Sequence, residues 1–454
     1  FLVSEGIRQS GTLGQVIKKL LPQGKTTVFK AQLRILPSVA FISAFLNNTP
    51  VVVIFAPIIK HWAKSVKLPA TKFLIPLSYV TILGGICTLI GTSTNLVVHG
   101  MILEAGYEGF TMFELGKVGI FIAIAGIIYL FIFSKRLLPD ARPDTAVPDE
   151  EVEEGEKLHR VEAVLGARFP GINKKLSDFN FQRHYGAEVK EIKTRNGQRY
   201  VDHLEDVVLR EGDTLVVMAD DTFIPTWGES SVFVLLTNGN DPDTSGKKKR
   251  WLALILLVLM IVGATVGELP ATKEMFPDIK LDMFFFVCIT TIIMAWTNIF
   301  PARKYTKYIS WDILITIACA FAISKAMVNS GVADCVAGFI IGLSDDYGPH
   351  VLLAILFVIT NLFTELITNN AAAALAFPLA LSISAQLGVS PTPFFVVICM
   401  AASASFSTPI GYQTNLIVQG IGNYKFTDFV RIGLPLNIIT FLISVILIPL
   451  IWNF

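Results

Sequence analysis

The sequence predicts a polytopic α-helical membrane protein that consists of two repeats with a small α/β domain inserted between them. The 454-residue chain is 53% hydrophobic and only 16% charged, with a mean hydropathy of +0.60, whereas soluble domains carry about a quarter charged residues. Residues 135–250 hold 40 of its 73 charged side chains (37 basic and 36 acidic in all). Short segments of the first part also recur about 320 residues later. These observations indicate two membrane regions around one soluble insert.

Several charge-free stretches are long enough to cross a bilayer, which requires about 20 apolar residues. They occupy 35–59, 73–103, 118–134, 251–267, 283–302, 366–424 and 432–454. The stretch 366–424 contains Asn, Gly and Pro residues in its interior, so we expect two or three crossings joined by turns. Polar turns at membrane depth are tolerated only inside the protein or beside a wet cavity. Interaction with the lipid bilayer is therefore expected, and with a net charge of +1 nucleic-acid binding is not.

Residues 135–250 are predicted to form a cytoplasmic insert, because basic residues flank both of its ends. Lys135 and Arg136 open it and 247–250 (KKKR) close it, and the positive-inside rule places such flanks in the cytoplasm. Strands are expected at 187–193 and 214–219, with turns at Asn196-Gly197 and 211–213 and an acidic linker over 140–156.

Four pairs of segments recur in one order at nearly one offset, which predicts two structural repeats, 1–134 and 251–454. The pairs are Ser10-Gly11 and Ser330-Gly331, Asn47-Asn48-Thr49 and Thr368-Asn369-Asn370, Gly91–Asn95 and Gly411–Asn415, and Phe110-Thr111 and Phe426-Thr427. About 70 residues precede the first paired segment of the second repeat, whereas the first repeat starts at that segment. We therefore expect this chain to lack the first two or three crossings of its first repeat.

Two of these pairs are candidate helix breaks. Secondary transporters are commonly built from two repeats whose broken helices meet near the membrane midplane. Neutral amides, hydroxyls and freed carbonyls suit Na⁺, while helix N-termini and amide donors suit an anion, so one break can bind both. Glycine is expected at Gly91 and Gly411 because a Cβ there would crowd both the ion and the facing hairpin. Glycine also permits the positive φ values of an unwound helix, and simple close packing of helices is the alternative explanation.

An enzyme is not expected, because the chain has no GxSxG, HExxH or P-loop motif. No His, Cys and Asp cluster has metal-ligand spacing, and the five cysteines lie singly in apolar runs, so we expect no metal other than Na⁺ and no organic cofactor. Glu365 lies in an apolar run, with Ala44 at the matching position of the first repeat. An ion or proton role and a structural pairing both stay open for this carboxylate.

The paired Asn/Thr turns resemble the duplicated Ser-Asn-Thr hairpins of the divalent anion:sodium symporters, the solute carrier 13 type of permease within the ion transporter superfamily. The Gly-led turns are similar to that family's Gly/Ala-Thr-Pro-Pro-Asn turns. The insert, with Gly186-Ala187 and Gly212–Leu215, resembles the C-terminal domain of regulator-of-potassium-conductance proteins (TrkA-C). Asn replaces Ser at Asn47 and Thr at Asn370, and the two prolines are missing, which leaves the substrate open.

The resemblance implies an inverted-repeat homodimer in the bacterial inner (plasma) membrane, with re-entrant hairpins that meet unwound turns at the substrate site. It implies a small anionic substrate, either a sulfate-like oxyanion or a C4-dicarboxylate, and Na⁺ as coupling ion. The implied anion-binding residues are Asn48, Thr49, Thr92, Ser93, Asn369, Asn370, Tyr412 and Gln413. The implied Na⁺-binding residues are Asn47, Asn48, Gly91 and Asn95 in one site and Thr368, Asn369, Gly411 and Asn415 in the other.

Two other functions fit the same sequence. One is an anion channel or channel-like permease gated by a small molecule bound to the insert, which would carry uncoupled current. The other is a membrane sensor that has lost transport, which the intact duplication of the polar turns disfavours.

Overall fold

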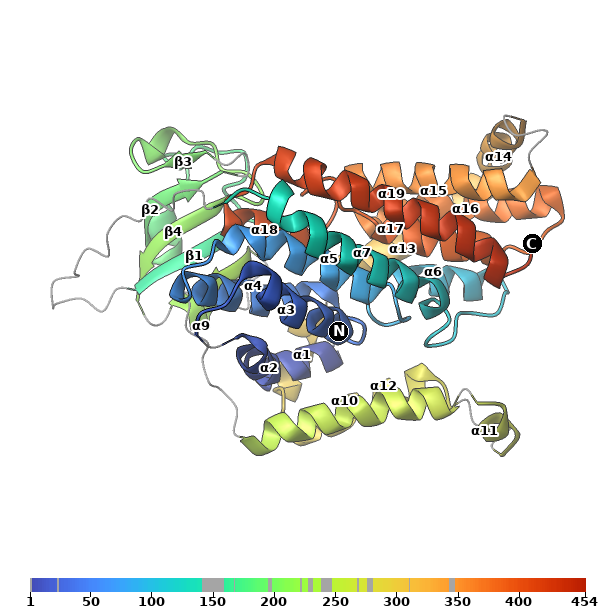
Figure 1. The fold of residues 1–454 in the computed structure, drawn as a ribbon, viewed down its shortest axis with the longest axis horizontal. Helices are drawn as coiled ribbons and strands as arrows, with labels where there is room; N and C mark the ends of the chain where they lie inside the picture. Colours follow the sequence, from blue (N-terminus) through green and yellow to red (C-terminus); the bar gives the residue numbers. More distant parts are fainter. Residues whose placement is uncertain are drawn as a thin grey trace.

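The computed structural model describes most of the chain. The described residues are 2–22, 24–140, 159–166, 168–194, 198–220, 223–227, 232–237, 247–267, 269–275, 281–309, 311–342 and 348–454. They form a helical bundle with a small sheet at one end (Figure 1). The expected Asn196-Gly197 turn and most of the acidic linker lie outside the described residues.

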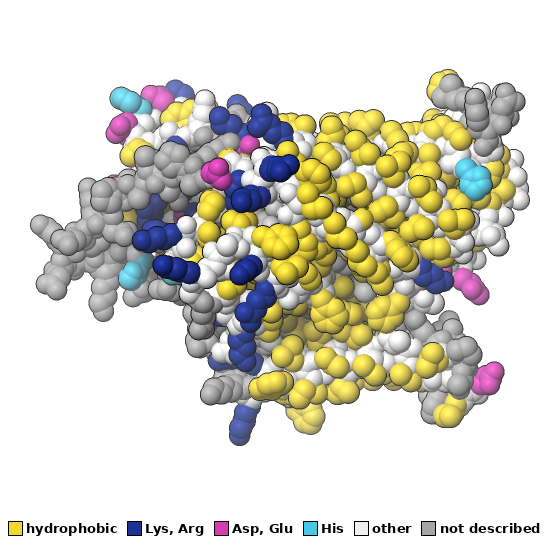
Figure 2. Space-filling view, viewed as in Figure 1, with side chains coloured by type: hydrophobic (Ala, Val, Ile, Leu, Met, Phe, Trp, Pro, Cys, Tyr) yellow, Lys and Arg dark blue, Asp and Glu magenta, His cyan; other side chains and the backbone are white. Residues whose placement is uncertain are grey.

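Five helices among the described residues are long and apolar enough to cross a membrane. They are α7 (Gly116–Leu137), α10 (Lys247–Gly267), α15 (Gly348–Leu366), α16 (Asn369–Leu387) and α19 (Phe426–Ile451). A sixth is present if α13 (Trp311–Asn329) and α14 (Val332–Gly342), bent by 71°, are one span. Hydrophobic side chains cover the flank of the bundle, and Lys and Arg side chains gather at the end near the sheet (Figure 2). The prediction of a polytopic membrane protein is confirmed.

The same series of helices occurs twice along the chain. The first series has α1 (Leu2–Gln9), α2 (Thr12–Leu20), α3 (Val28–Ser43), α4 (Asn48–Ser65), α5 (Leu74–Gly85), α6 (Ser93–Glu104) and α7. The second has α13, α14, α15, α16, α17 (Thr392–Ser403), α18 (Gln413–Gly422) and α19. Between the series lie α10, α11 (Pro270–Met275) and α12 (Met283–Trp296), and 3₁₀ turns occupy Ala70–Lys72, Leu204–Asp206 and Ala302–Tyr308.

Packing follows the same pairing in both series. Helix α3 packs on α5 as α15 packs on α17, and α4 packs on α18 of the other series as α16 packs on α6. The first break of each series lies at a matching glycine, Gly11 with φ +70° and Gly331 with φ +73°. Only glycine adopts this left-handed conformation at low cost. The second arms α4 and α16 also carry matching prolines, Pro57 and Pro378.

The insert contains one antiparallel sheet of five strands in the order β3-β2-β4-β1-β5. The strands are β1 (His159–Leu165), β2 (Glu188–Lys193), β3 (Arg199–Tyr200), β4 (Thr214–Ala219) and β5 (Phe233–Thr237). Strands β2 and β4 lie where the sequence predicts them, and Gly212 turns the chain before β4 with φ +84°. The described helices α8 (Phe181–Tyr185) and α9 (Phe223–Trp227) have only five residues each, so the sheet dominates the insert.

Candidate functional site

Four helix N-termini meet where the two series of helices touch. Helices α4, α6, α16 and α18 begin at Asn48, Ser93, Asn369 and Gln413. All eight predicted anion-binding residues lie at these starts, either in the first turn or, as for Thr92 and Tyr412, at the N-cap. The unpaired N–H groups of a first helical turn and the helix dipole together favour an anion.

Asn48 connects the hairpin of the first series to the break of the second. Its side chain is fully buried, and its Nδ2 donates to Tyr412 Oη over 2.6 Å. Thr92 Oγ1 lies 3.1 Å from the same Tyr412 hydroxyl, while Thr49 Oγ1 donates to Gln413 Oε1 over 3.4 Å. Tyr412 therefore bridges the hairpin and the break of the first series.

The second hairpin makes the reciprocal contacts. Asn370 Oδ1 accepts hydrogen bonds from Ser93 Oγ at 3.4 Å and from Thr94 Oγ1 at 3.2 Å. Asn369 is buried, and its Oδ1 accepts from Thr364 Oγ1 over 2.9 Å. In the first series, Asn48 Oδ1 likewise accepts from Ser43 Oγ over 2.7 Å. The predicted anion-binding residues are thus brought together, apart from Asn369, whose amide oxygen bonds within its own hairpin.

Two threonines brace the breaks in the same way. Thr88 Oγ1 accepts from Gly91 N and donates to Ala44 O. Thr408 Oγ1 accepts from Gly411 N over 3.3 Å and donates to Glu365 O over 3.0 Å. Each threonine therefore ties a break to the tip of the hairpin in its own series.

Asn95 and Asn415 are fully buried and turn back onto the breaks. Asn95 Nδ2 donates to Thr88 O at 2.9 Å, and Asn415 Nδ2 donates to Thr408 O at 3.1 Å. Their amide oxygens differ. Asn415 Oδ1 accepts from Ser78 Oγ at 2.7 Å, whereas Asn95 Oδ1 has no hydrogen-bond partner. Asn95 thus keeps an oxygen available for a cation.

Gly85 lies against the side-chain amide of Asn48 and the main chain of Gly91. A side-chain Cβ built on Gly85 would lie 2.6 Å from Asn48 Oδ1, 3.0 Å from Asn48 Nδ2 and 3.1 Å from Gly91 O. Two of the predicted Na⁺ ligands are therefore close to Gly85, and a side chain at this position would collide with them. In the second series, Ser405 stands 320 residues after Gly85 and donates to Thr364 O over 3.3 Å.

The positive φ predicted for the break glycines is wrong, because neither Gly91 nor Gly411 has one. The predicted crowding by a Cβ is found at both positions, against neighbouring protein atoms. A Cβ on Gly91 would lie 2.5 Å from Gly85 O and 2.7 Å from Gly85 Cα. A Cβ on Gly411 would overlap Ser405 Oγ and approach Thr364 O to 2.5 Å. Main chain or a short side chain fills the position where a Cβ would be.

Two predicted Na⁺ ligands are less enclosed than the others. Asn47 is the N-cap of α4 without a side-chain capping bond, and it is half-buried. Thr368 is the exposed N-cap of α16, and its Oγ1 accepts from Ala371 N over 3.4 Å.

The sequence reasoning missed six residues around these turns, all with side chains of three heavy atoms or fewer. They are Ser43, Gly85, Thr88, Thr364, Ser405 and Thr408. The repeat offset identifies part of this set, since it pairs Gly85 with Ser405 and Thr88 with Thr408.

Comparisons with known proteins identify the family of this chain. A family model described as citrate transporter matches residues 1–388 and 275–454. The chain belongs to this family. An uncharacterized transporter of Synechocystis sp. is 29% identical over 538 residues, covering 100% of this chain and 88% of that protein.

Two relatives that match over shorter segments of the chain have names that include sodium. A probable sodium/sulfate cotransporter of Chlamydomonas reinhardtii is 32% identical over 282 residues, covering 62% of this chain and 31% of that protein. A sodium-dependent dicarboxylate transporter of Staphylococcus saprophyticus is 25% identical over 145 residues, covering 32% and 28%. The protein is therefore an integral membrane transporter and not an enzyme, and its predicted resemblance to solute carrier 13-type permeases is supported.

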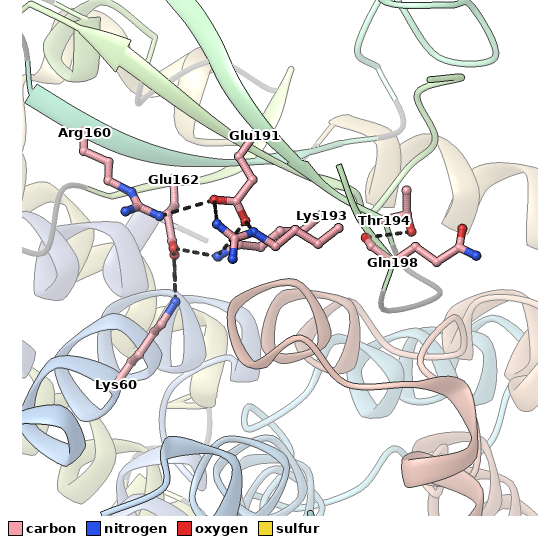
Figure 3. A network of polar contacts seen from close by, with 8 residues as sticks. Lys60, Arg160, Glu162, Glu191, Lys193, Thr194 and Gln198 are labelled. Carbon is pink, nitrogen blue, oxygen red and sulfur yellow. Dashed lines mark hydrogen bonds and ion pairs between the residues drawn. The ribbon is translucent and has the colours of Figure 1, made fainter. Parts of the chain in front are cut away.

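The insert of this transporter contacts two of the helices that begin at the site. Lys60 of α4 points to the sheet and donates to both carboxylate oxygens of Glu162 on β1, at 3.1 and 3.2 Å (Figure 3). Lys193 Nζ donates to the same carboxylate at 3.2 Å. On α18, Gly420 lies against Thr214 and Val164, and Leu416 lies against Gly212.

Glu162 is held in its charged form. Burial raises the pKa of this carboxyl, but the Lys60 and Lys193 ammonium groups outweigh it and lower the pKa from 4.5 to about 2. Its neighbour Glu191 is 2% exposed and lies 2.6 Å from Arg199. The insert thus contacts α4 at Lys60, in the C-terminal part of that helix, and α18 at Leu416 and Gly420.

Proposed function

We propose that the transporter is a Na⁺-coupled symporter of a small divalent anion. The observation that carries this proposal is the meeting of four helix N-termini, those of α4, α6, α16 and α18. Each helix N-terminus carries about half a positive charge, so four of them supply roughly the charge that balances a divalent anion. The described side-chain contacts of the eight anion-binding residues include no Lys or Arg.

Na⁺ would bind at the opposite helix ends. Carbonyl groups at the C-terminal end of a helix carry the negative end of the dipole, and α5 ends at Gly85 beside Asn48 Oδ1 and Gly91 O. We assign one Na⁺ site to Asn47, Asn48, Gly91 and Asn95. The second site would comprise Thr368, Asn369, Gly411 and Asn415, where Asn415 contributes as a brace of the break, since its oxygen already accepts from Ser78.

Coupling between Na⁺ and the anion would come from Asn48. An amide offers an oxygen to a cation and an NH₂ group to an anion. The Asn48 amide lies beside Gly85, and its Nδ2 donates to Tyr412 Oη. Na⁺ at the oxygen would therefore fix the amide in the orientation that the anion needs.

The substrate class follows from the site and is supported by the relatives. A site made of N–H groups, amides and hydroxyls recognises a compact, doubly charged oxyanion or carboxylate pair. Relatives named as sodium/sulfate cotransporter and sodium-dependent dicarboxylate transporter carry both chemistries. Our proposal is a sulfate-like oxyanion, with a C4-dicarboxylate as the other member of the class.

We also propose that the two series are inverted with respect to each other, and that two copies of the chain form a dimer in a bacterial inner (plasma) membrane. The insert is cytoplasmic, as the basic border near the sheet suggests (Figure 2). It is a TrkA-C-like domain that binds a small-molecule ligand.

Uptake into proteoliposomes tests the proposal. Sulfate, succinate and citrate are offered with and without an inward Na⁺ gradient. We expect saturable uptake of a divalent anion that requires the gradient. Asn48→Ala and Asn369→Ala should each abolish this uptake while the protein stays folded and inserted. Normal transport by both variants would contradict the assignment of the site.

A channel controlled by the insert is the second candidate, and the contact of the sheet with α4 and α18 favours it. The same vesicles distinguish the two functions. Anion current that follows voltage, without saturation and without a need for Na⁺, would support the channel and refute the symporter.

A further inference from the structure

One carboxylate in the membrane region has hydrogen bonds to only one of its two oxygens. Glu365 lies in the last turn of α15. Its Oε1 accepts from Ser407 N at 2.8 Å and from Asn437 Nδ2 at 2.7 Å. Its Oε2 is buried and has no hydrogen-bond partner. Within the described part of the chain, no Lys, Arg or His forms an ion pair with this carboxylate.

A second buried oxygen without a partner belongs to the same cluster. Asn437 is only 6% exposed in the middle of α19, and its Oδ1 has no hydrogen-bond partner. The orientation of this amide is fixed, because Nδ2 donates both to Glu365 Oε1 and to Ser407 Oγ at 2.8 Å. Rotating the amide by half a turn would place Oδ1 against the carboxylate.

Two such oxygens in one apolar region are costly. A buried polar group without a hydrogen-bond partner destabilises the fold, and a buried charge without a counter-charge does so more strongly. The buried Tyr79 hydroxyl donates to Phe406 O at 2.5 Å. A hard cation prefers oxygen ligands of the kind that Glu365 and Asn437 leave open.

The first series of helices lacks this cluster altogether. Gly433 of α19 lies against the Phe406 carbonyl, and Gly119 of α7 lies in the same way against the Ile86 carbonyl. The two glycines therefore occupy matching positions. Asn437 and Ala123, each four residues further along its helix, match as well. The repeat offset aligns Glu365 with Ala44 and Ser407 with Cys87. All three polar groups are thus replaced by small, weakly polar side chains in the first series. A structural need shared by both hairpins would not explain this difference.

We propose that Glu365, Ser407 and Asn437 form a third cation site, which binds one Na⁺ between Glu365 Oε2 and Asn437 Oδ1. The site lies outside the two Na⁺ sites assigned above, and it exists in only one half of the molecule. Because Ser407 belongs to the break between α17 and α18, a cation here would stabilise one arrangement of that break. Its role in transport rests on the proposed symport, whereas the binding itself does not.

Equilibrium binding of ²²Na⁺ to the purified full chain in detergent tests this site. We expect Glu365→Gln to bind one Na⁺ fewer per protomer than the unaltered protein. The Gln side chain can still accept from Ser407 N and Asn437 Nδ2, and its NH₂ group can reach Asn437 Oδ1, so folding should be kept. The triple variant E365A/S407C/N437A, which copies the first series, should lose the same single ion.

Glu114→Gln is the matched control. Glu114 also accepts one backbone and one side-chain N–H, from Thr111 at 3.1 Å and from Trp452 at 3.2 Å, but these bonds occupy both of its oxygens. This variant should keep the full number of bound Na⁺ ions. An unchanged number in folded Glu365→Gln would overturn the third site, even with Na⁺-driven uptake intact. Absence of Na⁺ binding in the unaltered protein would overturn the third site and the symport proposal together.

Discussion

Replacing Lys60 by Met should weaken the contact between the insert and α4. Lys60→Met keeps most of the side-chain stem and removes the charge that Glu162 faces. The pKa of Glu162 falls from 4.5 to about 2, which corresponds to roughly 3 kcal/mol in favour of the charged carboxylate. The side chains of Lys60 and Glu162 are only 23% and 17% exposed, so screening by solvent is limited.

Lys60 shares this stabilisation with Lys193. About half of it, roughly 1.5–2 kcal/mol, should be lost in the variant, within the range for hydrogen bonds to charged groups. Local opening of β1 should therefore become about 10- to 30-fold more frequent. Amide hydrogen exchange of residues 159–165 in the detergent-solubilised full chain measures this opening.

Lys190→Met on β2, which β4 separates from β1 in the sheet, is the control. Lys190 pairs with Glu188 at 2.7 Å, but both side chains are 55% exposed, and exposed pairs contribute about 0–1 kcal/mol. Exchange in β1 should stay within about twofold of the unaltered protein. Equal acceleration in both variants, or none in Lys60→Met, would refute the reasoning.

The same carboxylate predicts a pH dependence. Because folding and docking lower the pKa of Glu162, its contribution is fully present above the ordinary pKa of 4.5 and is lost as pH falls toward about 2. Exchange in β1 should therefore be insensitive to this group between pH 7 and pH 5, after correction for the intrinsic rate, and increase at lower pH. In Lys60→Met the pKa of Glu162 should be lowered less, because only Lys193 remains beside the carboxylate. The contribution of Glu162 should therefore be lost over a narrower pH range that begins at the same upper limit and ends at a higher pH.

Gly91→Ala and Gly411→Ala should each destabilise the protein by about 1–3 kcal/mol, because the new Cβ overlaps its neighbours. The control Gly100→Ala should melt at the temperature of the unaltered protein, since its Cβ would lie 3.7 Å from Phe321. Equal melting temperatures for all three variants would contradict the packing role of Gly91 and Gly411. Tyr412→Phe should raise the KM for the anion about two- to tenfold, because the hydroxyl that orients Asn48 is lost. Tyr107→Phe is the control and should leave KM unchanged, since the Tyr107 side chain is half-exposed and takes no part in these bonds. Removing residues 140–246 should leave KM nearly constant and change the maximal rate, since both pairs of turns lie outside the deleted segment; loss of all anion binding in a folded deletion variant would show that the site is misplaced.

The repeat offset is the reason that much of the site could be predicted from the sequence. Breaks in a membrane helix need polar residues to satisfy the freed main chain, and these residues recur about 320 positions apart, as at Gly91–Asn95 and Gly411–Asn415. The helix starts at Asn48, Ser93, Asn369 and Gln413 follow from the same pattern.

Other parts of the site could not be predicted, because they depend on contacts between distant segments. The bond from Asn48 to Tyr412 spans 364 residues, and the ion pair from Lys60 to Glu162 spans 102. From the sequence alone, Lys60 near the end of α4 would be taken for a solvent-exposed charge. Its role becomes visible only when the sheet is placed against the helix. Gly85 shows a different difficulty, since its importance comes from the side chain it lacks.

The polarity of the helices argues for coupling rather than for a simple pore. Asn48 lies at the N-terminal end of α4, and Gly85 lies at the C-terminal end of α5. In the proposed symporter, a cation at the C-terminal end of α5 and an anion before α4 would each meet the helix end of opposite sign. Either ion alone would leave the other helix ends without a counter-charge, so binding of the two should be cooperative. A continuous pore would need the anion to pass Tyr412 and Asn370, which the reciprocal hydrogen bonds to the first series hold across the junction. Passage then requires these four turns to separate, and in the proposed symporter bound Na⁺ would control that movement.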